Sequence, residues 1–282
     1  MNNAKWTRVH TTLVLLLIGA LIYIATNLEV YFSLIGIWSA LTACIVVFIV
    51  ILGHGITGSW RGAFIDDRNV ISLSRFQMLA WTALVLSAFL AAALWNIGLN
   101  VQDPIDSIQL EPSLWMLMGI STTSLVASPL ILSGKKSQQP DASQVNEVFE
   151  LLENKGEGAA TNRGLVVGNK YISQARWGDM FTGEETGNAA HLDLARVQMF
   201  FFTIVVLLAY AVAVATMFAN VDVIDIPVTA FPKLSQGLLA LIGISHVGYL
   251  ANKAAPLSAT SQNGGNASNA PSAADAERPA VG

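Results

Sequence analysis

The heptapeptide Ser72-Leu73-Ser74-Arg75-Phe76-Gln77-Met78 returns later in the chain as Asp193-Leu194-Ala195-Arg196-Val197-Gln198-Met199. The match continues inward at the same offset, pairing Thr82 with Thr203, Val85 with Val206, Ala88 with Ala209 and Phe89 with Tyr210. A second echo follows each copy, LMGIS at 117–121 and LIGIS at 241–245. Each copy opens an apolar run, so the pattern predicts a duplicated helical hairpin.

An aromatic and acidic lead-in precedes each copy. The matching residues are Trp60, Phe64, Asp66 and Asp67 before the first copy, and Trp177, Phe181, Glu184 and Glu185 before the second. An even number of predicted spans separates the copies, so both have the same orientation. We therefore expect a parallel repeat about a pseudo-two-fold axis along the membrane normal.

The composition indicates a membrane protein. Apolar residues make up 53% of the chain and charged residues 12%, whereas soluble domains carry about 25% charged residues. Runs without Asp, Glu, Lys or Arg cover 9–28, 30–60, 76–102, 112–134, 197–221 and 234–252. Each can supply the roughly 20 residues of a spanning helix, and none alternates like a barrel strand. The fold class is therefore an all-α membrane protein with six transmembrane helices; a soluble protein with six buried helices is the alternative.

The distribution of positive charge predicts the orientation. Lys and Arg fall at the N-terminus, in every second loop and after the last span: Lys5, Arg8, Arg61, Arg68, Arg75, Lys135, Lys136, Lys155, Arg163, Lys170, Arg176, Arg196 and Lys253. Only Lys233 departs from this alternation. Because positive loops stay in the cytoplasm, both termini are expected there.

Spans and loops divide the chain into five regions. These are an N-terminal transmembrane hairpin (1–56), repeat 1 (57–134), a cytoplasmic loop segment (135–175), repeat 2 (176–253) and a disordered tail (254–282). Each repeat is a cytoplasmic lead-in followed by a transmembrane hairpin. In the loop segment, Asp141 or Ser143 is expected to cap a helix that ends near Gly156, and Gly168-Asn169 to form a turn.

Charged and polar residues of both copies gather at the cytoplasmic ends of their spans. The candidate girdle around the inner mouth consists of Asp66, Asp67, Arg75, Gln77, Glu184, Glu185, Arg196 and Gln198. Each arginine would hold an acidic pair, because its planar guanidinium binds carboxylates in bidentate fashion. The alternative is that both arginines are snorkelling anchors. The two glutamines would bond to each other or to a hairpin partner, or would line a polar path.

The most polar stretches within the spans are 119–124 (GISTTS) and 243–246 (GISH). The candidate residues for helix packing or for a pathway are Gly119, Ser121, Thr122, Gly243, Ser245 and His246. Small residues allow close helix packing; the rival interpretation is a hydrated pathway or an oligomer axis. His246 is a functional candidate because ionisable groups are rare inside membranes, although it can also simply bond a neighbouring helix.

No catalytic set is recognisable. The spans lack central Asp, Glu, Lys and Arg, the phosphate-binding motif Gly-x-x-x-x-Gly-Lys-Ser/Thr does not occur, and Cys44 is the single cysteine. A metal site would have to use Asp179, Glu184, Glu185, His191 and Asp193, whose spacing matches no known loop. We expect no enzymatic activity, no cofactor and no metal, and the net charge of −4 gives no indication of nucleic-acid binding.

Two stretches carry a resemblance. The run 196–203 (RVQMFFFT) and the ending 238–245 (LLALIGIS), followed by Gly248-Tyr249-Leu250 and Lys253, resemble uncharacterised bacterial multi-pass membrane proteins with a duplicated Leu-x-Arg-x-Gln-Met and Gly-Ile-Ser hairpin. The resemblance covers about half of the chain. It implies a bacterial cytoplasmic (inner) membrane and no particular activity.

The sequence favours an oligomeric, non-enzymatic component of the inner membrane. Its lipid-embedded helices would carry segment 135–190 as a docking or sensing surface for a cytoplasmic protein, because the duplicated polar features lie on that side. The alternative is a channel or small-solute permeation protein lined by the Gly-Ile-Ser helices. An enzyme at the inner leaflet would require Glu184, Glu185 and Asp193 to bind a metal.

Overall fold

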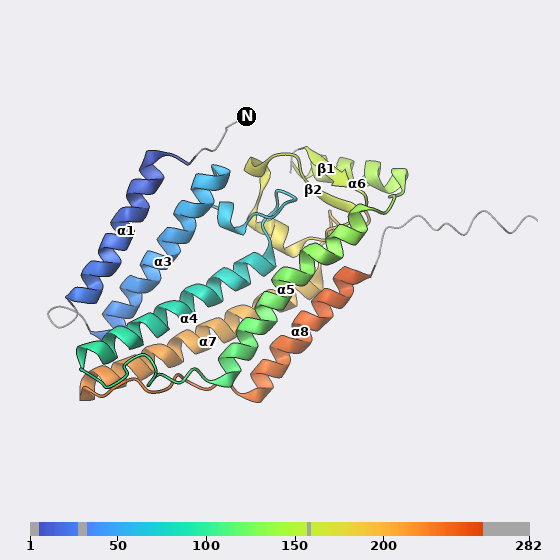
Figure 1. The fold of residues 1–282 in the computed structure, drawn as a ribbon. Helices are drawn as coiled ribbons and strands as arrows, with labels where there is room; N and C mark the ends of the chain where they lie inside the picture. The colour runs from blue at the N-terminus through green and yellow to red at the C-terminus, as the bar shows by residue number, and fades with distance from the viewer. Residues whose placement is uncertain (1–5, 28–32, 157–158, 256–282) are drawn as a thin grey trace, which may run out of the picture.

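A computed structural model of the chain describes residues 6–27, 33–156 and 159–255. Within these ranges the helices are α1 (Arg8–Thr26), α3 (Leu34–Thr57), α4 (Leu73–Gly98), α5 (Pro112–Lys136), α6 (Ala142–Asn154), α7 (Leu194–Ile224) and α8 (Gln236–Ala254), as Figure 1 shows. Strands β1 (Ala160–Arg163) and β2 (Val166–Asn169) form an antiparallel hairpin. Lys5 and almost all of the tail expected to be disordered lie outside the described residues.

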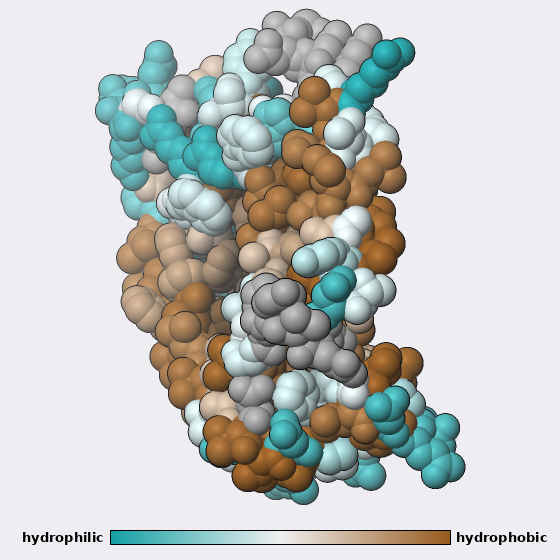
Figure 2. Space-filling view, turned by 90° about the vertical axis from the view of Figure 1, so that its left-hand side faces the viewer, coloured by the Kyte–Doolittle hydropathy of each residue, from teal (hydrophilic) through white to brown (hydrophobic). Residues whose placement is uncertain are grey.

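Five of these helices are long and apolar enough to cross a membrane. They are α1, α3, α4, α5 and the part of α7 from Leu194 to Val221. Among the described residues α8, the sixth predicted span, does not meet the same criterion, because polar side chains such as Ser245, His246 and Asn252 lower its hydropathy. Figure 2 shows apolar surface over the middle of one face and hydrophilic residues toward its ends. The helices are thus compatible with a membrane location.

The bundle is built around α4, which packs against α3, α5 and α7, while α8 packs against α5 and α7. Residues 137–193, here called the α5–α7 segment, cover one end of the bundle (Figure 1). We name this the segment end. The largest apolar cluster lies in the other half and includes the fully buried Leu34, Leu117 and Phe218. Buried Ala88, Ala91 and Ala92 of α4 have short side chains, which allow neighbouring helices to approach.

Helix α6 and the hairpin pack on each other within the α5–α7 segment. Asp141 caps α6 by accepting the Ser143 N–H at 2.8 Å, as the sequence suggested. The face of α6 with Val148 and Leu152 packs against Val167, Ala189 and Ala190. The prediction of a turn at Gly168-Asn169 was wrong, because both residues belong to β2. The chain reverses at Gly164, whose φ of +58° suits glycine.

Two loops pair at the opposite end of the bundle. Asn96, fully buried in α4, donates to the Val228 carbonyl at 2.9 Å and accepts the Val228 N–H at 2.8 Å. The Gln109 N–H donates to the Thr229 carbonyl at 2.8 Å. Lys233, the exception to the charge alternation, lies 3.4 Å from Glu111. The α4–α5 and α7–α8 connections are therefore joined by backbone and side-chain bonds.

The two lead-ins share two local features, a 3-10 turn and a backbone hydrogen bond that follows it. A 3-10 turn at Gly62–Phe64 precedes α4, and another at Trp177–Phe181 precedes α7. The Ser72 N–H donates to the Phe64 carbonyl at 2.8 Å, and the Asp193 N–H donates to the Phe181 carbonyl at 2.8 Å. Each bond closes a loop directly before the first residue of a long helix.

Candidate functional site

A buried cluster of charges lies where the α5–α7 segment meets the bundle. One carboxylate oxygen of Glu184 contacts three cations: Arg68 at 3.2 Å, Lys253 at 2.7 Å, and Arg196. These cations come from the loop before α4, from the last turn of α8 and from the first turn of α7. A single residue of the segment therefore holds three separate parts of the bundle together.

Two more carboxylates balance the charge of this cluster. Asp66 lies 2.9 Å from Arg68, and Asp193 lies 3.4 Å from Arg196. With Glu184 this gives three carboxylates to Arg68, Arg196 and Lys253, so the cluster is formally neutral. Neutrality matters because an uncompensated charge is expensive to bury, and the side chain of Glu184 is only 7% exposed.

The surroundings keep Glu184 charged. Burial by itself would raise the pKa of this carboxyl, but the positive charges of Arg196, Arg68 and Lys253 outweigh burial and hold it well below its ordinary value. For Arg68, burial would lower the pKa, and Asp66 and Glu184 raise it above its ordinary value. Both groups are therefore ionised at neutral pH.

Two further ion pairs fasten α5 to the same end. Glu185 pairs with Lys135, which also donates to the Ala255 carbonyl at 2.9 Å. The more exposed Lys136 pairs with Asp67. Burial alone would raise the pKa of Asp67, whereas Lys136 and Arg68 bring it below its ordinary value. The adjacent residues Glu184 and Glu185 together reach α5, α7 and α8.

The structure brings only part of the predicted girdle together. Arg196 contacts Glu184, but within the described residues Arg75 forms no ion pair. Asp66 pairs with Arg68 instead, and Asp67 pairs with Lys136. The two glutamines do not meet either. Gln77 is buried and donates to Thr203 Oγ1 at 2.6 Å, on α7 rather than on its hairpin partner, whereas Gln198 is exposed.

The Gly-Ile-Ser stretches meet in part along a polar seam between α5 and α8. Ser124 Oγ lies 2.5 Å from His246 Nδ1, and Lys253 donates to Ser128 and, at 3.0 Å, to Tyr249 Oη. Ser121 and Ser245 are also buried, and their hydroxyls have no hydrogen-bond partner in the described residues. Of the other candidates, Gly119 and Thr122 are exposed and Gly243 is half-buried. The seam leads from the charge cluster toward the middle of α5 and α8.

Several residues of the cluster were not singled out from the sequence. Arg68 and Lys253 counted only as positive-inside charges, and Ser128 was not considered. A sequence signal for Lys253 was present: it follows His246 and Tyr249 at helical spacing, which places the three residues on one face of α8. Among the described residues, no three His, Cys, Asp or Glu side chains gather as a metal site would require.

Comparisons with protein-family models, with curated proteins and with solved structures found no match to this chain. The resemblance to bacterial multi-pass proteins thus gains no support from these comparisons.

Proposed function

We propose that the protein is a non-enzymatic membrane component whose α5–α7 segment is a cytoplasmic docking or sensing surface coupled to the bundle. The proposal rests on the ion pairs of two adjacent residues of the segment. Glu185 pairs with Lys135 of α5, and Glu184 pairs with Arg196 of α7 and Lys253 of α8. A partner that moves the segment must also move these helix ends, because separating buried ion pairs is costly. Binding would in this way reach the membrane helices.

The proposal includes six spans, with both termini and the segment end on the cytoplasmic side of a bacterial inner membrane. Helix α8 has 19 residues, about 28 Å at 1.5 Å per residue, which is close to the hydrocarbon thickness of about 30 Å. It also lies beside α5 and α7. The matching bonds from Ser72 to Phe64 and from Asp193 to Phe181 support the proposed duplication.

Coupling between segment and helices is tested by hydrogen exchange of the full chain in lipid nanodiscs. In the Glu184→Gln variant we expect faster exchange both in 160–190 and at the segment ends of α7 and α8. Glu147→Gln, at an exposed position of α6, is the matched control and should leave exchange unchanged. Unchanged exchange at the ends of α7 and α8 in Glu184→Gln would show that the segment is not coupled to them.

Docking is tested with a photo-crosslinking amino acid at Tyr171, which is 53% exposed on the α5–α7 segment. The matched probe replaces Val126, 56% exposed on the outer face of α5. In cells we expect protein adducts from position 171 and lipid adducts from position 126. Protein adducts at both positions, or at neither, would contradict a docking role for the segment.

A second candidate function is permeation along the α5–α8 seam, favoured by the buried hydroxyls of Ser121 and Ser245 that lack partners among the described residues. In a Cys44→Ser background, this function predicts that Ser121→Cys and Ser245→Cys react with a membrane-impermeant thiol reagent. Thr122→Cys, facing outward, should not react. Protection of both seam positions would favour the docking proposal alone.

A further inference from the structure

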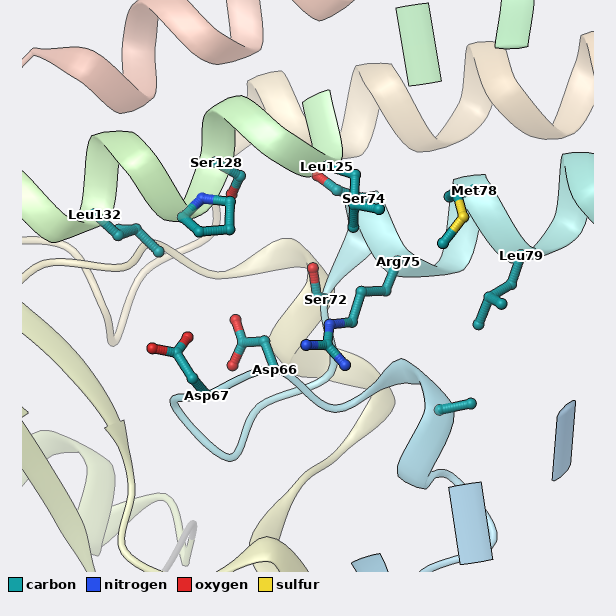
Figure 3. A pocket seen from close by; sticks show the side chains of 12 residues that line it. Asp66, Asp67, Ser72, Ser74, Arg75, Met78, Leu79, Leu125, Ser128 and Leu132 are labelled. Carbon is teal, nitrogen blue, oxygen red and sulfur yellow. The ribbon is translucent and has the colours of Figure 1, made fainter. Parts of the chain in front are cut away.

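A cavity between α4 and α5 adjoins the charge cluster and shares Asp66 and Ser128 with it. Its volume is about 280 Å³. The lining residues shown in Figure 3 fall into two groups: Asp66, Asp67, Ser72, Ser74, Arg75 and Ser128 are polar, and Met78, Leu79, Leu125 and Leu132 are apolar. Polar groups surround the first turn of α4, and Met78 and Leu79 follow further along the helix (Figure 3).

The polar end of the cavity has the components of a phosphate site. The side chain of Ser72 does not cap α4, whereas Asp193 accepts two N–H groups at the start of α7. No Ser72 side chain therefore occupies the N-terminus of α4, and a helix N-terminus favours an anion. Arg75 adds a cation without an ion pair in the described chain, and its guanidinium points into the cavity (Figure 3).

Ser74 supplies an independent indication of a ligand. The residue is 2% exposed and lines the cavity, yet its hydroxyl has no hydrogen-bond partner among the described residues. A buried hydroxyl without a partner is costly, so an acceptor or donor supplied from the cavity would remove that cost.

The same cavity offers acceptors for an ammonium group. The carboxylates of Asp66 and Asp67 face it (Figure 3). Each already pairs with one cation, Arg68 or Lys136, but a carboxylate has about four lone-pair sites and can accept a further hydrogen bond. Pro129 lies inside α5 and has no N–H, so the Leu125 carbonyl loses its regular helical partner. Groups that accept hydrogen bonds from an ammonium and groups that bind a phosphate therefore line the same cavity. Such a cavity suits a ligand that carries one positive and one negative charge.

We propose that this cavity binds the headgroup of a zwitterionic phospholipid with a primary amine, such as phosphatidylethanolamine. The phosphate lies at Arg75 and the first turn of α4, the ammonium lies at Asp66 and Asp67, and an acyl chain follows Met78 and Leu79. The cavity is smaller than the roughly 300–1,000 Å³ of whole-ligand pockets, so it holds the headgroup while the chains remain in the bilayer. The proposal does not depend on the docking role of the α5–α7 segment.

Native mass spectrometry of the full chain, titrated with phosphatidylethanolamine, phosphatidylcholine, phosphatidylglycerol or inorganic phosphate, tests the proposal. Phosphatidylethanolamine should bind at least tenfold more tightly than the other three, because only it carries both a phosphate and a hydrogen-bonding ammonium. Tighter binding of phosphatidylglycerol, equal binding of all lipids, or equally tight binding of inorganic phosphate would each overturn it.

Variants locate the site. Arg75→Gln should weaken phosphatidylethanolamine binding at least tenfold, whereas Arg8→Gln, a matched change at the exposed start of α1, should not. Asp67→Asn should reduce the preference for phosphatidylethanolamine over phosphatidylglycerol without weakening phosphatidylglycerol binding. If Arg75→Gln keeps its thermal midpoint and still binds like the wild type, the cavity is not the lipid site.

Discussion

Replacing Glu184 by glutamine removes the carboxylate that three cations share, and the structure allows the cost to be estimated. Arg68 and Arg196 keep Asp66 and Asp193 at 2.9 and 3.4 Å. Among the described residues, Lys253 keeps the hydroxyl groups of Ser128 and Tyr249 but no carboxylate, and its side chain is 4% exposed. Breaking a buried pair by removing one partner typically costs about 3–5 kcal/mol, so we expect that loss of unfolding free energy.

The assay is equilibrium unfolding in mixed micelles, with denaturing detergent titrated and tryptophan fluorescence recorded at pH 7. Glu147→Gln on the exposed face of α6 should change the free energy by less than about 0.5 kcal/mol. The double variant Glu184→Gln/Lys253→Met should recover part of the loss, because it removes the lysine left without a carboxylate. A loss below about 1 kcal/mol in Glu184→Gln alone would refute the reasoning.

Acidification removes the same negative charge from Glu184 by protonation instead of by substitution. The pKa of Glu184 is lowered in the folded state from an ordinary value of 4.5. Its stabilisation is therefore complete above about pH 4.5 and declines as the pH falls toward the folded pKa, by up to about 1.4 kcal/mol per pH unit. Wild type should lose more stability than Glu184→Gln between pH 5 and 3; equal losses would contradict the assignment.

Two further changes probe the rest of the fold. Asn96→Leu removes both bonds to the Val228 backbone and leaves buried groups without partners, which should cost about 1–3 kcal/mol; the same unfolding titration measures it, and a neutral result would mean that water replaces the amide. Gly62→Ala places a methyl group against Thr57 Oγ1 and the Gly53 backbone, whereas at Gly134 no atom of the described residues lies within 4 Å of the added methyl group. Overpacking should cost Gly62→Ala about 1–3 kcal/mol and Gly134→Ala almost nothing. Equal thermal midpoints of the two variants would contradict the close contact.

Much of the helical organisation could be predicted, because apolar run length and charge depend on local sequence. The runs at 76–102 and 112–134 correspond to α4 and α5, and Asp141, the cap of α6, was one of the two candidates offered by residue type. Local signals failed where tertiary contacts decide. Gly164 rather than Gly168 turns the hairpin because Gly168 lies against the backbone of Arg68, 2.5 Å from where a Cβ would stand.

The candidate site was predictable only in outline. Glu184 and Arg196 were expected near each other because both stand close to the start of α7. The sequence did not show that Arg68 and Lys253 belong to the charge cluster. Glu184 and Lys253, for example, are 69 residues apart in the chain, and such a separation leaves no local sequence pattern. The repeat also suggested that the two glutamines have equivalent surroundings, which they do not. Gln77 is buried where α7 packs against α4, whereas Gln198 is exposed.

The position of Lys253 has a consequence for biogenesis. It is the last charged residue of the described chain, at the end of α8, the predicted span with the least apolar sequence. Glu184, Arg68 and Arg196 are all synthesised earlier, so their cluster becomes electrically balanced only when α8 has delivered its lysine to the segment end. A chain that stops before Lys253, or whose α8 enters in the reverse direction, keeps an incomplete cluster. In the proposed six-span topology, the buried network is therefore complete only when α8 has been inserted in the correct direction.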